Sequence, residues 1–139
     1  MSFYQKFTLS AAGLTACSIG LAITFATHGF YAGYGIDLGE NRALLSELRA
    51  PGANLAILGA VIFTGVLRPG LARLSAALGT LVFFAYASGR IVGIVLDGWP
   101  GESILVALAI ELIVGSLCLF ELQRQNRPFR GSKISGHVS

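Results

Sequence analysis

Four long apolar segments dominate this sequence and constrain it more than any other feature. They cover residues 7–30, 50–67, 72–96 and 103–122. A helix needs about 20 apolar residues to cross roughly 30 Å of hydrocarbon. Lipid offers no hydrogen-bond partners to the backbone, so each segment should be helical. The sequence therefore predicts an all-α fold, an integral membrane up-and-down bundle of four transmembrane helices.

Composition and motifs narrow the function classes. Only 12% of the residues are charged and 54% are hydrophobic, whereas an average soluble domain has about 25% charged residues. Two cysteines are too few for a disulfide framework or a four-cysteine zinc site. The sequence contains no HExxH, CxxC, GxSxG or Walker motif, so nothing indicates a metal, a cofactor or an enzyme.

The basic residues predict the orientation of the chain. Seven Lys and Arg residues flank the spans on the side of both termini, namely Lys6, Arg68, Arg73, Arg124, Arg127, Arg130 and Lys133. Only Arg42 and Arg49 flank them on the other side. Cytoplasmic flanks carry the excess of Lys and Arg, so we expect both termini in the cytoplasm. The basic residues are spread along membrane flanks, and we therefore expect no nucleic-acid partner.

Two units follow from this pattern. Residues 1–122 form the predicted four-helix transmembrane domain, and residues 123–139 form a polar, basic tail that we expect to be disordered. The first segment has an apolar core longer than the roughly 7–15 residues of a signal peptide, so we expect it to remain as a helix.

Small residues recur every four positions, in Ala12, Ala16 and Gly20 and again in Ala85, Gly89 and Gly93. Such stripes serve helix packing or oligomerisation.

The connection before the second span predicts a short outer interfacial helix. Asn41 suits a helix N-cap, and Leu44, Leu45 and Leu48 then recur at helical spacing. Pro51 disfavours helical geometry at the residue before it. We therefore expect a boundary or a kink at this proline.

Two charges lie inside the predicted spans at matching depth. By helical rise, Arg90 lies about 10 Å inside the outer end of the third helix and Glu111 lies roughly 14 Å deep in the fourth. A charge at the bilayer centre costs about 2.5–3.5 kcal/mol on insertion scales. We therefore predict that these two side chains form an ion pair.

Further polar residues fall in the same outer half of the bundle. Asn54 lies at a similar depth, and Glu47, seven residues before it, shares its face; either could complete a ring around the Arg90 guanidinium. Arg49 and His28 lie nearer the outer surface. Glu121 lies near a span end, where we expect its side chain to reach water.

Short motifs in this order resemble one protein family. They are Ser46-Glu47-Leu48-Arg49-Ala50, Gly89-Arg90, Asp97-Gly98-Trp99-Pro100 and Glu111-Leu112. Together they look like the bacterial four-helix membrane proteins grouped as domain of unknown function 4345, over roughly residues 10–122. The resemblance implies a bacterial inner-membrane location and four helices, and it supplies no established activity.

Three functions remain open. The first is an accessory or structural subunit that contacts another membrane protein or a second copy of itself. The second is binding or transport of a small molecule or ion through an outward pocket at Arg90 and Glu111. The third, an intramembrane enzyme with Glu111 or His28 as general base, has no supporting nucleophile or metal motif.

Overall fold

The computed structural model describes residues 2–126, so most of the predicted tail, residues 127–139, lies outside the described part. The helices are α1 (Phe3–Phe25), α2 (Thr27–Ala32), α3 (Arg42–Leu67), the 3₁₀ turn η1 (Pro69–Leu71), α4 (Ala72–Asp97) and α5 (Glu102–Asn126). Residues 2–126 contain no strand. Four helical segments are long and apolar enough to cross a membrane, which confirms the predicted all-α architecture of a multi-pass membrane protein.

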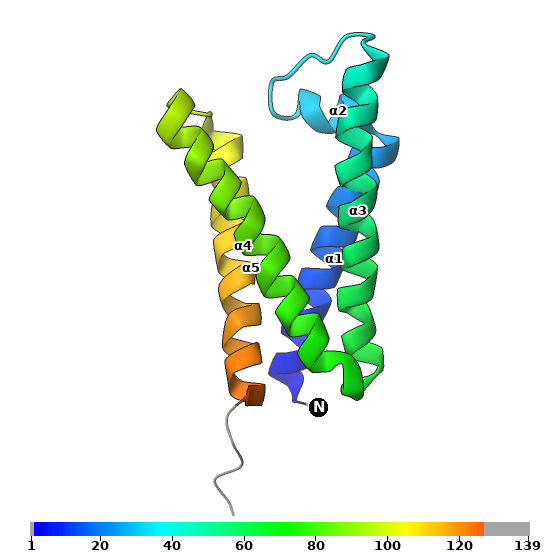
Figure 1. Ribbon diagram of the computed structural model, residues 1–139, viewed down its shortest axis with the longest axis vertical. Helices are drawn as coiled ribbons and strands as arrows, with labels where there is room; N and C mark the ends of the chain where they lie inside the picture. The colour runs from blue at the N-terminus through cyan, green and yellow to red at the C-terminus, as the bar shows by residue number, and fades with distance from the viewer. Residues whose placement is uncertain (1, 127–139) are drawn as a thin grey trace, which may run out of the picture.

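The two ends of the bundle differ in shape (Figure 1). We call the end with Ser2, η1 and Asn126 the closed end, and the end with α2 and the α4–α5 turn the open end. At the closed end, α1 packs against α5: Arg124 donates a 3.0 Å hydrogen bond to the Ser2 hydroxyl. Towards the open end the α1–α3 pair and the α4–α5 pair diverge (Figure 1).

Helices α1 and α3 form the closest contact in the bundle, and glycines make it possible. A Cβ on Gly13 would lie 2.8 Å from the Phe63 backbone nitrogen. A Cβ on Gly20 or Gly59 would collide with the backbone of the facing helix. The predicted stripe of Ala12, Ala16 and Gly20 is buried, so it serves packing within the chain.

One apolar core joins the two pairs. Its buried members come from all four long helices and are Ala12, Ala16, Leu55, Ile62, Val82, Phe83, Val114 and Cys118. On the α4–α5 side, a Cβ added to Gly115 would lie 3.3 Å from the Phe84 ring, so this aromatic ring fills the space a larger residue would need. The core thus holds the pairs together below the point where they separate.

The first helix ends earlier than the sequence predicts. The expected helix over residues 7–30 is interrupted at Ala26, whose φ of −123° and ψ of 46° are not helical. The Thr24 and Thr27 hydroxyls donate to the Gly20 and Ile23 carbonyls at 2.7 and 2.5 Å. Such side-chain bonds compete with the backbone ladder and often bend helices. Residues 27–32 therefore form the separate short helix α2.

The second helix, in contrast, is continuous where a boundary was expected. The Asn41 cap is confirmed, because its side-chain oxygen accepts a 3.1 Å hydrogen bond from the Leu44 N–H. From there α3 runs without interruption through Pro51. Pro51 is exposed on α3. The predicted outer helix is consequently the first part of α3.

Candidate functional site

Arg90 and Glu111 form the predicted ion pair. The Arg90 Nε donates to both Glu111 carboxylate oxygens at 2.9 Å. The tight turn that brings α4 and α5 side by side depends on Gly98 and Gly101, whose φ values of 87° and 97° favour glycine. The Glu111 side chain is 11% exposed and that of Arg90 is 25% exposed, so the carboxylate is enclosed and the guanidinium is partly open.

The ion pair uses only one of the three guanidinium nitrogens. Among residues 2–126, Arg90 Nη1 and Nη2 donate no hydrogen bond. A guanidinium has five N–H donors in a fixed planar fork. Four of these donors are therefore free to bind another group.

A cavity of about 890 Å³ lies between the diverging helix pairs and reaches this guanidinium. Its walls come from α1, α4, α5 and the segment after α1, and α3 contributes Leu55. Aromatic side chains are prominent in its lining, namely Phe30, Tyr31, Tyr34, Phe83 and Tyr86. Most of the lining is apolar, with Arg90 and Glu111 as its charged residues.

The segment over residues 27–39 covers part of this cavity. Phe30 packs edge-on against Tyr31, with ring centroids 5.2 Å apart, and at 5.4 Å from Tyr34. Burial raises the pKa of Tyr31, the neighbouring Tyr34 raises it further, and the positive charge of Arg90 opposes both effects. The Tyr31 phenol therefore stays protonated and able to donate a hydrogen bond.

Four of the predicted polar residues do not join Arg90. Arg49 Nε donates to the Thr27 hydroxyl at 3.1 Å, and His28 Nε2 lies 2.9 Å from the Gly39 carbonyl oxygen. Glu47 and Asn54 are exposed on α3. None of these four residues lines the cavity, so the expectation that Glu47 or Asn54 completes the ring around the guanidinium is wrong.

The reason is geometric. Matching depths fix a residue's height in the bundle and leave its direction around the helix open. On α3, Glu47 and Asn54 lie on exposed faces outside the cavity lining, and Arg49 contacts the α1–α2 junction through Thr27.

Two sets of residues escaped the sequence reasoning. The cavity phenols Tyr31 and Tyr34 are the first set. The position of Tyr86, one helical turn before Arg90 and on the same face, is readable from the sequence. The second is Glu121, which is 1% exposed and does not reach water as expected. One of its oxygens accepts a 3.4 Å hydrogen bond from Gln125, and the other accepts no hydrogen bond within residues 2–126 and lies 4.0 Å from Arg124 Nη1. Its place on the same buried face of α5 as Glu111, Val114 and Cys118 was a readable signal.

A metal centre has no support in the described structure. Within residues 2–126 no three His, Cys, Asp or Glu side chains come together as ligands. Cys17 and Cys118 are free thiols. The residues that line the cavity offer hydrogen bonding from a guanidinium and phenols, beside an apolar wall.

The fold and the site define a small multi-pass helical membrane protein with a polar pair inside an apolar cavity. Residues 4–122 match the family described as Domain of unknown function (DUF4345). The chain belongs to this family, as its motifs indicated. No curated protein and no solved structure matches the chain. The family description states no activity, so the function is argued from the site.

Proposed function

We propose that this protein binds a small molecule in its cavity, against Arg90 and Glu111. The observation that carries the proposal is the partly exposed guanidinium, whose Nη groups donate no hydrogen bond within residues 2–126. A charged group at membrane depth is costly and is a functional-site hypothesis by default. Ligand sites are concave, mostly apolar and about 300–1,000 Å³ in volume, and the cavity of about 890 Å³ falls in this range.

A test is native mass spectrometry of the full chain released from mild detergent. We expect the wild type to carry a small molecule that the double variant Arg90→Leu/Glu111→Leu loses. Changing both partners avoids leaving one charge buried and unpaired. The matched control is Glu47→Gln/Asn54→Ala on the exposed face of α3, which should retain the molecule. A wild type without any bound molecule, or a double variant that retains it equally, would contradict the proposal.

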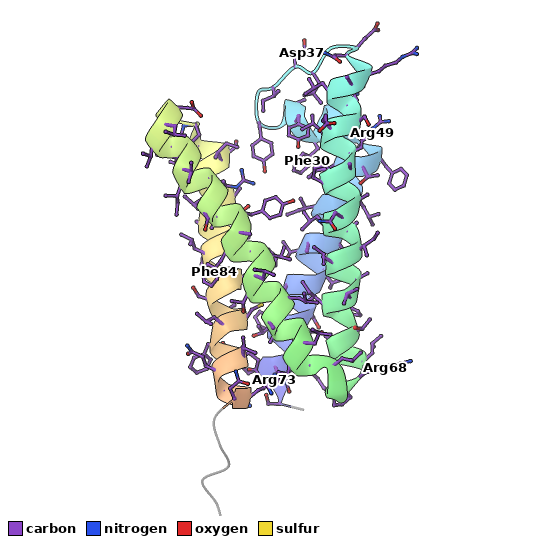
Figure 2. The ribbon with its side chains drawn as sticks, viewed as in Figure 1. Phe30, Asp37, Arg49, Arg68, Arg73 and Phe84 are labelled. Atoms are coloured by element: carbon purple, nitrogen blue, oxygen red, sulfur yellow. The ribbon has the colours of Figure 1, made fainter. Side chains whose placement is uncertain are left out.

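We propose further that both termini face the cytoplasm, in the inner membrane of a bacterium. Arg68 and Arg73 lie at the closed end with Lys6 and Arg124, whereas Arg49 lies at the open end (Figure 2). Impermeant maleimide on intact cells tests the orientation with single cysteines. We expect Glu40→Cys to react and Gly70→Cys to react only after lysis. The opposite pattern would contradict the proposed orientation.

A second candidate is the accessory role, in contact with another membrane protein or a second copy. It is favoured by Gly89 and Gly93 on α4: a Cβ added at either would meet no atom within 4 Å. Packing within the chain therefore does not use this small-residue stripe, and such stripes let a further helix approach closely. In vivo crosslinking should show an adduct that Gly93→Leu abolishes. Absence of any adduct in the wild type would count against this role.

A further inference from the structure

We infer that the ligand of this cavity is a single-chain amphiphile with an acidic headgroup, a carboxylate or a phosphate, which enters from the bilayer. The headgroup lies on Arg90 and the chain lies between the two helix pairs. The inference rests on the proposed function and adds the class of ligand. It follows from the polar end, the apolar end and the side opening of the cavity.

The polar end offers donors in the arrangement that an acidic headgroup requires. Glu111 accepts the hydrogen bonds from Arg90 Nε. The edge of the guanidinium formed by Nη1 and Nη2 remains available to a ligand. This planar edge matches a carboxylate or phosphate with two parallel hydrogen bonds. Tyr31, Tyr34 and Tyr86, which carry phenol hydroxyls, also line the cavity. Hydrogen bonds to an ionised acceptor are about twice as strong as neutral ones, which favours an acid over an alcohol or ester.

Glu111 fixes the orientation of the Arg90 guanidinium. Its carboxylate is enclosed and fixes the guanidinium by two 2.9 Å contacts from Nε. The planar fork is therefore held in one orientation before a ligand binds. Preorganisation of this kind lowers the entropic cost of binding.

The apolar end of the cavity suits a hydrocarbon chain. Val82 precedes Arg90 by two helical turns, so the floor lies about 12 Å further into the bundle than the guanidinium. Ala16, Leu55 and Phe83 complete this floor. Immediately beyond it Ile62 and Cys118 are fully buried in the packed core. The cavity therefore ends within the bundle, and Thr15, beside Ala16, is the polar residue near this floor.

The side opening explains how such a molecule reaches the site. Two residues that line the cavity from α5, Val106 and Ile110, are 59% and 44% exposed. On α4, the lining residue Tyr86 is 37% exposed. All three belong to helices long and apolar enough to span the membrane. The cavity consequently reaches the lipid-facing surface, and its occupant is one that partitions into lipid.

The test is binding of four probes to the full chain in detergent: palmitate, hexadecyl phosphate, methyl palmitate and hexadecanol. We expect at least one acidic probe to bind about tenfold or more tightly than both neutral probes. Comparing palmitate with hexadecyl phosphate assigns the headgroup. The variant Arg90→Leu/Glu111→Leu should lose this preference.

Two alanine positions on α5 distinguish binding of the hydrocarbon chain in the cavity from binding to the rest of the protein surface. Ala107 lines the cavity, whereas Ala109, two residues further along α5, is exposed. Ala107→Phe should weaken binding of every probe about tenfold or more, whereas Ala109→Phe should not. Equal binding of acidic and neutral probes, still weakened by Ala107→Phe, would overturn the acidic headgroup and leave the proposed function standing. Absence of binding by all four probes, together with no molecule on the wild type in native mass spectrometry, would overturn both.

Discussion

The α1–α3 pair and the α4–α5 pair solve the problem of packing in lipid in different ways. Between α1 and α3, glycines bring two backbones together along most of their length, and no ion pair is needed. Between α4 and α5, the Phe84 ring packs against Gly115, and the Arg90–Glu111 ion pair adds a polar contact. Tight backbone contact between α1 and α3 therefore builds the scaffold, while the α4–α5 pair carries the polar chemistry.

The contrast continues at the two ends of the bundle. At the closed end, α1 meets α5 through Tyr4 and Phe120, whose ring centroids are 5.8 Å apart. At the open end, the same two helices are separated by the cavity of about 890 Å³. Stability and binding are therefore expected to respond to different substitutions.

The largest effect is expected where the two backbones touch. Gly20→Val would force its side chain into the backbone of Gly52 and Ala56 and should lower the free energy of unfolding by about 3 kcal/mol or more. Titration of unfolding with dodecyl sulfate in mixed micelles measures this loss. The control is Gly93→Val, where an added Cβ meets open space. Similar losses for both variants would refute the glycine contact.

The next largest effect concerns the ion pair. Glu111→Ala leaves Arg90 without its partner. Because the Arg90 side chain is 25% exposed, the loss should be about 2 kcal/mol, below the 3–5 kcal/mol of fully buried pairs. Arg90→Leu/Glu111→Leu should recover most of it, since apolar replacement of both partners is often neutral. The same unfolding titration compares the variants. A double variant as unstable as Glu111→Ala would argue against the pairing.

A smaller effect is expected at the α1–α2 junction. Thr27→Val removes the acceptor of the Arg49 hydrogen bond and should cost about 1 kcal/mol. Hydrogen exchange should quicken over residues 28–38, because this bond holds the segment against α3. Thr80→Val is the matched control, since the Thr80 hydroxyl bonds within its own helix. Unchanged exchange over residues 28–38 would show that the bond does not hold the segment.

The smallest effect is a pH dependence at Tyr31. Burial raises its pKa above the ordinary 10.0, so the folded state favours the neutral phenol. This contribution to stability is complete below pH 10 and is lost as the pH rises through the raised pKa. Melting temperatures between about pH 8 and 11 should therefore fall less steeply for Tyr31→Phe than for the wild type. If the melting temperatures of the wild type and of Tyr31→Phe fall equally with pH, Tyr31 does not contribute to the pH dependence of stability.

The sequence predicted the crossings and the ion pair because both depend on position along a helix. The length of the apolar segments predicted four spans, and the matching depths of Arg90 and Glu111 predicted their ion pair. The break at Ala26 was not predicted, since it depends on hydroxyl groups that bond to the turn before them. The cavity was not predicted in detail either, because the angle between the helix pairs depends on which small residues meet. Depth alone placed Asn54 beside Arg90, whereas its direction on α3 separates the two.

The cavity exists only if the helix pairs diverge at the open end, and spin-label distances measure this divergence. One pair of labels at Phe25→Cys and Ser103→Cys reports α1 to α5 at the open end, and one at Phe3→Cys and Gln123→Cys reports the closed end. The native Cys17 and Cys118 are replaced by alanine, and the protein is held in lipid nanodiscs. We predict a clearly longer distance at the open end (Figure 1). Equal distances at the two ends would mean a parallel, sealed bundle and would contradict the account.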